Sequence, residues 1–489
     1  MSAHEVPEEL FFLDRAQSRS LQAQIRESVV SAVVTGRLLP GARLPSTRKL
    51  AKYLSVSRLT VTLAYQELVG QGFLAAAPRS GYVVSDAAPR PHISRVPHLE
   101  ASEGIDWGAK LPRSLLERRQ IEKPLDWRSF PFPFIYGQMD MSLFHHNAWR
   151  DCARQALGRR DFEDMARDAA ADDDPMLVDY ICSRTLPRRG IAADPNEILV
   201  TVGAQNALWL TIQLLAREGL HAVCENPGYP DIATALRWNG ARVAAVDVDQ
   251  DGLPPDDLPP DVDVVFVTPS HHAPTAVTMP PSRRLRLLQA ANERDFVIVE
   301  DDYEFEMSFL TPPSQALKSL DGAGRVIYVG SFSKALFPGL RLGYLVGPEP
   351  FIRQARQLRS LMLRHPPGHQ QRTVAYFLAL GHYDSLIRDM RKAFAERREI
   401  LTRALENKGL EISGAASFGG TNLWIKGPDG LDSLRFAHEL RDDGVLIEPG
   451  APFFENSSEP IQFFRMAYSS IPSGRIEEGV DRIAGRLFA

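Results

Sequence analysis

The feature that most constrains the fold of this chain is a series of short apolar runs in its middle third. The runs read EILVTV, HAVCEN, VDVVFVTPS, FVIVEDD, VIYVGS and LGYLVG, between residues 197 and 347. Each has the length of a strand, and amphipathic segments separate them. Strands that are buried on both faces show continuous apolar runs rather than alternation. We therefore predict an α/β fold with a mainly parallel sheet, covered by helices on both faces.

The composition fits a large globular protein. The chain has 489 residues, 44% hydrophobic and 24% charged, which indicates two or three domains. Its three cysteines, Cys152, Cys182 and Cys224, form no CxxC motif, so neither a disulfide scaffold nor a cysteine-rich zinc site is expected. The N-terminus is acidic and polar, unlike a signal peptide, and no apolar run approaches the roughly 18 residues of a membrane helix. We expect a cytoplasmic protein with no membrane partner.

Charge and proline content divide the chain into three parts. Residues 43–79 hold six basic side chains and one acid, although the whole chain has a net charge of −5. A proline-containing stretch with little apolar periodicity follows, which is typical of an extended linker. We predict a basic module at 1–85, a linker at 86–119 and an α/β body at 120–489. The Asp/Ala cluster at 168–174 is expected to be a solvated loop.

The N-terminal part has the pattern of a helix, a helix-turn-helix and a hairpin. Residues 21–36 form a helical pattern that ends at Gly36. Ser46 is a natural N-cap for a second helix, and a third begins at Arg58. Two short strands then flank Arg79-Ser80-Gly81. This is the layout of a winged helix, with the third helix placed to meet DNA. A small helical cap with a solvated basic face is the alternative.

The string PSTRKLAKYLSVSRLTVTLAYQELVGQGFL, at 45–74, carries a family resemblance. It is similar to the GntR-type winged-helix module over about 65 residues, which implies that double-stranded promoter DNA is a partner. By position in that family's motif, the resemblance implies DNA contacts from Arg48, Ser57, Arg58 and Thr60, with a wing tip at Ser80 and Gly81.

The segment SFSKALFPGLRLGY, at 331–344, indicates a covalent cofactor. A lysine amine is nucleophilic only when deprotonated, and burial or neighbouring cations lower its pKa. Lys334 is flanked by Ser331 and Ser333, and Arg341 follows; two hydroxyls and a fixed cation suit a phosphate. An aldehyde that carries a phosphate would use both features. The segment therefore predicts pyridoxal 5'-phosphate as the cofactor.

Two further segments fit the same cofactor. FVIVEDDYEFEM, at 296–307, places acids and a tyrosine after a buried strand, where ligands gather in open α/β sheets. An aspartate there can pair with a pyridinium nitrogen, and a tyrosine can hydrogen-bond the ring oxygen. VTVGAQNALWLTI, at 200–212, is a strand, a glycine turn and a helix start, which suits phosphate. Taken singly, these features also suit a surface lysine, a capping aspartate and a common turn.

In this order the segments resemble fold-type I aminotransferases over roughly residues 120–489, and SFSKxxxPGxRxGY is the most specific element. Joined to a winged helix, they resemble the MocR/GabR family of bacterial transcription regulators. The resemblance implies Lys334 as the Schiff-base lysine, Asp301 at the pyridine nitrogen, Tyr303 at the ring oxygen and Tyr229 stacked on the ring. It also implies a phosphate site of Gly203, Ala204, Gln205, Ser331, Ser333 and Arg341, and an effector's acid group on Arg465. A structural salt bridge is the alternative for Arg465.

The chain departs from the aminotransferase pattern at two places. Ala273-Pro274-Thr275-Ala276 stands where those enzymes have Asn-Pro-Thr-Gly. Val178 stands where arginine is expected, which puts contacts between subunits in doubt. The pairs His145-His146 and His271-His272 have no metal-ligand spacing, so we expect no metal site.

The leading hypothesis is a homodimeric transcriptional regulator that senses an amino compound through pyridoxal phosphate, by forming an external aldimine. Taurine is favoured as the effector, because the whole chain most resembles taurine-responsive members; γ-aminobutyrate and other ω-amino acids are further candidates. The rival hypothesis is an aminotransferase with an appended DNA-binding domain, since the machinery for a first half-reaction is present. A DNA-binding protein without cofactor is the third.

Overall fold

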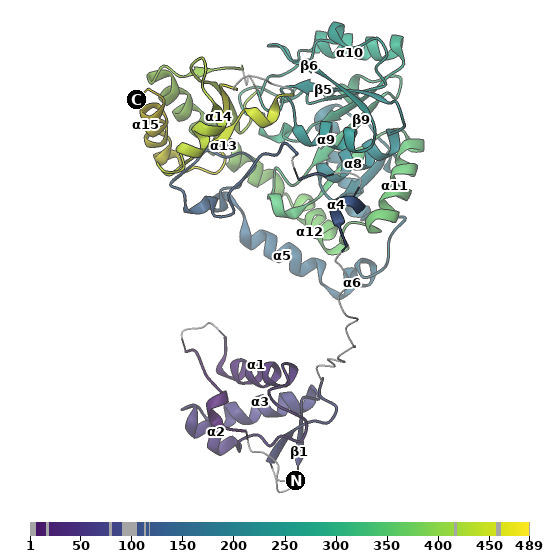
Figure 1. Ribbon diagram of the computed structural model, residues 1–489. Helices are drawn as coiled ribbons and strands as arrows, with labels where there is room; N and C mark the ends of the chain where they lie inside the picture. Colours follow the sequence, from purple (N-terminus) through teal and green to yellow (C-terminus); the bar gives the residue numbers. More distant parts are fainter. Residues whose placement is uncertain are drawn as a thin grey trace. The chain divides into compact units, whose positions relative to one another are not determined.

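The chain forms two compact units, Met1–Arg113 and Ser114–Ala489, drawn in Figure 1. The computed structural model describes residues 6–15, 19–77, 81–89, 105–111, 114–116, 118–414, 418–455 and 461–488. The division between the units falls inside the predicted linker, which also holds the short helix α4 (Trp107–Lys110). Among the helices of the described residues, none is long and apolar enough to span a membrane.

The smaller unit has the predicted winged-helix elements: three helices, α1, α2 and α3, and a hairpin of β1 and β2. Their bounds are Leu21–Val34, Thr47–Tyr53, Arg58–Gly70, Leu74–Ala77 and Gly81–Val84. A serine hydroxyl caps the N-terminus of each helix, accepting a backbone N–H from within the first turn. The strands pair antiparallel, from Leu74 opposite Val84 to Ala77 opposite Gly81.

The core of this unit follows the helical spacing. Leu50, Val61, Tyr65 and Leu68 are fully buried, as their periodicity predicts. The Tyr65 hydroxyl donates a hydrogen bond to the Pro45 carbonyl at 3.2 Å, so a polar group in the core is satisfied. Packing on this core therefore fixes α3 against α2 and leaves the other face of α3 exposed.

The larger unit is built on a seven-stranded sheet with the order β4-β10-β9-β8-β7-β5-β6. All six predicted apolar runs form strands. The bounds of β4 to β10 are Ile198–Thr201, His221–Asn226, Arg242–Asp247, Val264–Val267, Val297–Asp301, Val326–Ser331 and Gly343–Val346. The apolar runs did not predict β6, because it lies at the sheet edge and several of its side chains are exposed.

Strand β10 is the exception to the parallel arrangement. It pairs antiparallel with both β4 and β9, whereas β5 to β9 are mutually parallel. The prediction of a mainly parallel sheet is confirmed, and LGYLVG forms an antiparallel strand within it. Only residues 332–342 connect β9 to β10, and a parallel neighbour needs a crossover of about a dozen residues or more. The tight return places Lys334 and Arg341 in one connection, at the carboxyl end of β9.

Helices cover both faces of this sheet, as predicted (Figure 1). Leu199 packs in the cluster that includes α8 and α11, and its neighbour Val200 packs in the cluster that includes α12 and α13. Successive strand residues point to opposite faces, so these clusters are the two faces. The bounds of α8 to α13 are Ala204–Leu215, Pro230–Trp238, Pro281–Arg294, Glu349–Leu363, Gly368–Ala379 and His382–Asn407.

A smaller antiparallel sheet, in the order β11-β12-β15-β14, completes the unit. Its strands are Glu411–Ile412, Asn422–Lys426, Phe463–Ala467 and Glu448–Pro449, respectively. A separate parallel pair joins β3 (Phe132–Pro133) to β13 (Val445–Leu446). The remaining α-helices are α5 (His146–Ala156), α6 (Arg159–Met165), α7 (Pro175–Tyr180), α14 (Ser433–Glu439) and α15 (Ile476–Leu487).

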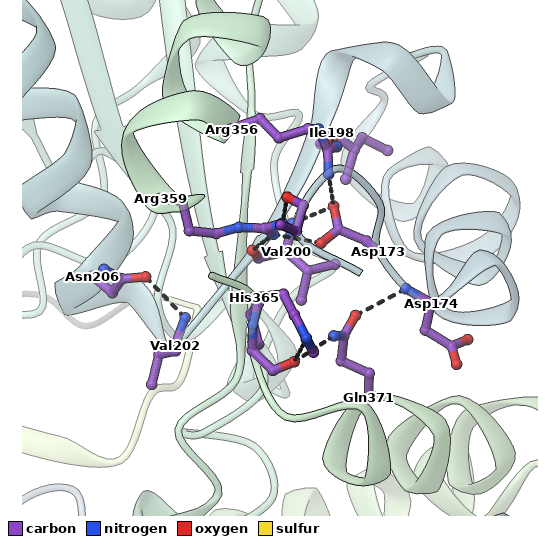
Figure 2. A network of polar contacts seen from close by, with 12 residues as sticks. Asp173, Asp174, Ile198, Val200, Val202, Asn206, Arg356, Arg359, His365 and Gln371 are labelled. Carbon is purple, nitrogen blue, oxygen red and sulfur yellow. Dashed lines mark hydrogen bonds and ion pairs between the residues drawn. The ribbon is translucent and has the colours of Figure 1, made fainter. Parts of the chain in front are cut away.

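A buried ionic network links strand β4 to Asp173, in the segment that precedes this strand in the chain (Figure 2). Asp173 is 1% exposed and accepts hydrogen bonds from Arg356 and from Arg359, which is fully buried. The prediction of a solvated loop at 168–174 was therefore wrong for Asp173. Composition could not reveal it, because its two partners lie on α11, far along the chain. Both arginines also donate to backbone carbonyls of β4, so the network holds this strand just before the Val202–Gly203 turn.

Candidate functional site

A cavity of about 380 Å³ opens where the carboxyl ends of β8 and β9 meet the N-terminus of α8. The structure brings together around it every residue predicted to bind cofactor or effector, apart from Gly203, which adjoins it. The predicted lining residues are Ala204, Gln205, Tyr229, Asp301, Tyr303, Ser331, Ser333, Lys334, Arg341 and Arg465. Segments far apart in sequence meet here because parallel strands end at one sheet edge.

Lys334 projects into this cavity from the β9–β10 connection. Its side chain is exposed where it opens into the cavity, and its amine lies 4.3 Å from the centre of the Tyr136 ring. Desolvation of the amine and, next, the nearby charge of Lys123 together lower the pKa of Lys334 to about 7. A substantial fraction of the amine is therefore neutral and nucleophilic near pH 7.

Asp301 and Tyr303 present buried polar atoms to the same cavity. Asp301 ends β8 and is 8% exposed, and Tyr303 is 7% exposed. Within the described residues, Asp301 Oδ1 and the Tyr303 hydroxyl have no hydrogen-bond partner. Burial and, next, the nearby charge of Asp302 together raise the pKa of Asp301 to about 7. Buried groups without partners are costly, so these two atoms indicate a ligand that carries polar groups.

An anion-binding corner lies at the start of α8. Gly203 has φ +79°, and a Cβ at this position would lie 3.3 Å from the Arg341 guanidinium carbon. Only glycine combines this backbone conformation with so close a cation. Arg341 Nη2 donates to the Val202 carbonyl at 3.4 Å, which holds the guanidinium beside the first N–H groups of α8. Cation and helix terminus together suit a phosphate.

Ser333 is engaged with the backbone. Leu342 N–H donates to the Ser333 hydroxyl at 3.0 Å, and this hydroxyl reaches the Leu342 carbonyl at 3.3 Å. These bonds close the β9–β10 connection around Lys334. Ser333 therefore shapes the loop, and its predicted contact with a phosphate stays a prediction.

Tyr229 is held by two side chains. Its hydroxyl lies 2.9 Å from both Gln205 Oε1 and Asp231 Oδ2. Asp231 lines the cavity and is 23% exposed. The tyrosine ring is thus fixed at the cavity wall beside α8, where the sequence predicts it to stack on a cofactor ring.

Arg465, predicted to bind an effector's acid group, lies in a buried ion pair. Its Nε donates to Glu448 Oε2 at 2.7 Å, and its guanidinium carbon lies 4.3 Å from the Tyr136 ring centre and 4.8 Å from that of Phe453. Arg465 also lines the cavity. The structural salt bridge is therefore present, and the same guanidinium borders the space in which a ligand would lie.

Sequence motifs missed three residues of the site: Lys123, Tyr136 and Glu448. Lys123 and Tyr136 line the cavity, and Glu448 is buried beside Arg465. Lys123 follows the predicted linker, whereas Glu448 faces Arg465 across the β14–β15 register. No short motif contains these residues, so only their arrangement in space identifies them.

The His271-His272 pair lies beside buried carboxyl groups. His271 Nε2 lies 3.2 Å from Glu304 Oε2, and His272 Nε2 lies 3.5 Å from Glu225 Oε2. Burial lowers the pKa of His271 to about 4 and that of His272 to about 3, so both rings are neutral near pH 7. Over the described ranges, no group of three or more His, Cys, Asp or Glu side chains could hold a metal ion.

The predicted DNA contacts lie on one part of the smaller unit. Arg48 on α2 and Arg58 on α3 are exposed, and Arg58 Nε donates to Thr47 Oγ1 at 3.3 Å. The Ser57 hydroxyl accepts from Thr60 N–H at 3.0 Å, so Ser57 caps α3. Gly81 starts β2 with φ +86°, and Ser80 lies outside the described residues.

Comparison with known families identifies both units. Residues 21–84 match the family described as "Bacterial regulatory proteins, gntR family". Residues 153–483 match "Aminotransferase class I and II". The two matches account for the winged-helix elements and for the sheet that carries the cavity.

Full-length relatives combine the same two parts. The chain is 51% identical to the HTH-type transcriptional regulator TauR of Rhodobacter capsulatus over 482 residues, 99% of each chain. It is 29% identical to the probable rhizopine catabolism regulatory protein MocR of Rhizobium meliloti, covering 98% of this chain and 96% of that one.

Solved structures resemble the larger unit. α-Aminoadipate aminotransferase LysN of Thermus thermophilus, complexed with N-(5'-phosphopyridoxyl)-L-leucine, superposes with a TM-score of 0.70 at 27% identity. Kynurenine aminotransferase of Pyrococcus horikoshii, in complex with PMP, gives 0.69 at 25% identity. Each match covers 78% of this chain and 98% of the enzyme. The chain therefore belongs to the MocR-type transcriptional regulators, in which a GntR-type helix-turn-helix module and a class I/II aminotransferase domain form one polypeptide.

Proposed function

We propose that this regulator binds pyridoxal 5'-phosphate and senses a small amino compound, taurine or another ω-amino acid, to control genes for its uptake or breakdown. The observation that carries the proposal is that three features meet around one cavity. They are a lysine whose pKa is lowered to about 7, a buried carboxyl oxygen with no hydrogen-bond partner among the described residues, and an anion-binding corner. An aldehyde, a ring nitrogen and a phosphate are the groups that these features suit.

The residues present fit the cofactor. Lys334 would hold it covalently, Asp301 would face its ring nitrogen, and Tyr303 its ring oxygen. Arg341 and the N-terminus of α8 would hold the phosphate, with Ser331 beside them. When bound, pyridoxal phosphate supplies an aldehyde carbon that condenses reversibly with amines. The protein's contribution is to orient it and to keep the Lys334 amine partly neutral, because burial and neighbouring cations lower its pKa to about 7.

Two observations support a small anionic amine as the effector. Arg465 and Lys123 both line the cavity and are both cations, and neither is among the predicted phosphate contacts. The full-length relative at 51% identity is named TauR, and the sequence resembles taurine-responsive members of the family. Taurine carries an amine and a sulfonate on a two-carbon chain, so it offers one group to the aldehyde and one to the cations.

The winged helix would bind promoter DNA through Arg48 and Arg58. Ser57 and Thr60, at the start of α3, would add contacts, as would the predicted wing tip at Ser80 and Gly81. A homodimer would present two such modules to two half-sites, and the protein would act in the cytoplasm. Residues 118–123 offer a route from the cavity: Arg118 and Lys123 line it, and the same segment continues the predicted linker.

The proposal is tested with the full chain loaded with pyridoxal phosphate. We expect a cofactor absorption band that changes on adding taurine, and salt-sensitive binding to a selected DNA duplex that taurine alters. A protein that gains no band, and no mass at Lys334 after borohydride trapping, contradicts cofactor binding. A band that γ-aminobutyrate shifts and taurine leaves unchanged contradicts the taurine assignment.

An aminotransferase is the second candidate function, because Lys334, Asp301 and Tyr303 line one cavity as catalysis would require. Rapid turnover of an amine with a keto acid, without binding to any selected DNA duplex, favours this enzyme. Turnover slower than effector exchange, together with specific DNA binding, favours the regulator.

A further inference from the structure

Three cationic side chains surround the ring of Tyr136. Lys334 Nζ and the Arg465 guanidinium carbon each lie 4.3 Å from the ring centre, and Lys123 Nζ lies 5.6 Å from it. Tyr136 itself is 5% exposed. Arg465, Lys123 and the partly neutral amine of Lys334, placed around one buried aromatic ring, give this wall of the cavity a positive character.

This wall holds more positive than negative charge. Glu448 is the carboxylate between Arg465 and Lys123, 2.7 Å from the first and 3.5 Å from the second. The pKa of Glu448 is lowered, chiefly by Arg465 and Lys123 against the effect of burial, so Glu448 is ionised. Glu304 also faces Lys334, but burial raises its pKa to about 7. Glu448 is therefore the one full negative charge shared by Arg465 and Lys123. Burial lowers the pKa of Lys123 even with Glu448 beside it, so an anionic ligand at this wall would favour the charged form of the amine.

Lys123 is placed to reach such a ligand. Its amine donates a hydrogen bond to the Tyr136 carbonyl, which fixes its position, and its side chain is 28% exposed. A Cβ on Gly137 would lie 3.4 Å from Lys123 Nζ and 3.0 Å from Lys334 Nζ. Both amines thus lie close to one point. A ligand with its amine near Lys334 and its acid group near Lys123 needs only a short spacer.

We propose that Lys123 is a specificity-determining residue, which binds the anionic group of the effector together with Arg465 and selects amines with an acid group on a short chain. The inference rests on the proposed function and deepens it. Within the described residues, hydrogen bonds engage Arg465 through Nε alone, so its two terminal nitrogens and the Lys123 amine supply several donors. A sulfonate or carboxylate, whose oxygens only accept, matches this set of donors.

The test compares two amines that share a two-carbon chain. Taurine ends in a sulfonate and ethanolamine in an uncharged hydroxyl. The full chain is loaded with pyridoxal phosphate, and each amine is titrated against the cofactor absorption band. In the Lys123→Gln variant we expect taurine to bind about tenfold to a hundredfold more weakly, because a charge-assisted contact is lost, and ethanolamine to bind as before.

Two further variants serve as controls. Lys123→Arg keeps the positive charge and should retain most of the preference for taurine. Lys318→Gln removes another half-buried lysine, which pairs with Asp321 at 3.3 Å and does not line the cavity. This variant should change neither titration. Ethanolamine also controls for any change in Lys334, since both amines must react at the same site.

The outcomes separate this inference from the proposed function. Equal weakening of both amines in K123Q, or no weakening of taurine, overturns the role of Lys123. If no amine changes the band of the unsubstituted protein, the proposed function fails and this inference fails with it. Should K123Q not fold, Lys123→Met carries the test: it removes the charge and keeps most of the length of the side chain, and an equal effect on taurine and ethanolamine overturns the inference.

Discussion

Arg465 and Glu448 face each other across the β14–β15 register and form a buried ion pair, with 2.7 Å between Nε and Oε2 and side chains only 3% and 1% exposed. The pair holds the guanidinium between the rings of Tyr136 and Phe453. A flexible arginine is thereby fixed at the cavity wall before any ligand arrives, which reduces the conformational entropy lost on binding.

Breaking this pair should destabilise the larger unit. Glu448→Leu leaves Arg465 as a buried charge with its main partner removed, and we expect a loss of about 3–5 kcal/mol in the free energy of unfolding. The double variant Glu448→Leu, Arg465→Met places apolar groups at both positions and should recover most of this loss. Chemical denaturation of the cofactor-loaded chain measures both effects. A double variant as unstable as E448L contradicts the assignment of the loss to an unpaired charge.

The rate of covalent cofactor loading should depend on pH through Lys334. Because its pKa is lowered to about 7, the neutral amine becomes dominant above this pH, and the loading rate should rise through about pH 7 and then level off. Lys123 lowers this pKa, so Lys123→Gln should move the midpoint to higher pH. Stopped-flow absorbance with added pyridoxal phosphate gives the profile. A midpoint near the ordinary lysine value would show that the amine is not perturbed.

Asp301 should make the cofactor-free protein less stable as pH rises. Its pKa in the folded state is raised from 3.8 to about 7, so between these values the folded state holds a proton that the unfolded state releases. The free energy of unfolding therefore falls as pH increases across this interval, by about 4 kcal/mol from this group. Asp301→Asn should remove that share of the decline. Denaturation at several pH values tests it, and an identical slope in both proteins contradicts it.

Arg58 should contribute to DNA binding through its exposed charge. In Arg58→Ala we expect affinity for a duplex selected from random DNA to fall about tenfold, with a smaller dependence on salt. Arg37, an exposed arginine of the same unit that bonds the Thr35 hydroxyl, provides the matched control. Anisotropy titrations at two salt concentrations distinguish them. Equal losses in both variants would indicate a general charge effect without a specific contact.

Ser57 has a structural role that can be separated from its predicted DNA contact. Its hydroxyl caps α3, so Ser57→Ala should cost about 1 kcal/mol in the stability of the smaller unit. Ser57→Asp keeps a cap but places a negative charge beside phosphate, so it should retain stability and lose DNA affinity. Thermal unfolding and anisotropy together test this. A Ser57→Asp variant that binds DNA normally would place Ser57 away from the interface.

Local pattern was sufficient for much of the fold. Six apolar runs became six strands, Ser46 caps α2 as predicted, and the buried positions Val61, Tyr65 and Leu68 follow helical spacing. These features depend on neighbours within a few residues, where propensity and periodicity act. The antiparallel direction of β10 was not predicted, and the burial of Asp173 was predicted wrongly, because both depend on partners that a local window does not contain.

The sequence by itself determined which chemistry this protein can hold: the lysine that follows two serines, the aspartate at the end of a buried strand and the glycine turn before a helix are each readable in short segments. Only the tertiary structure decided that Lys123, Tyr136 and Glu448 join Arg465 beside Lys334. Charges act over a few ångströms, and the contacts of Lys123 with Glu448 and of Tyr136 with Arg465 join positions more than three hundred residues apart, so the packing of strands and loops sets these distances.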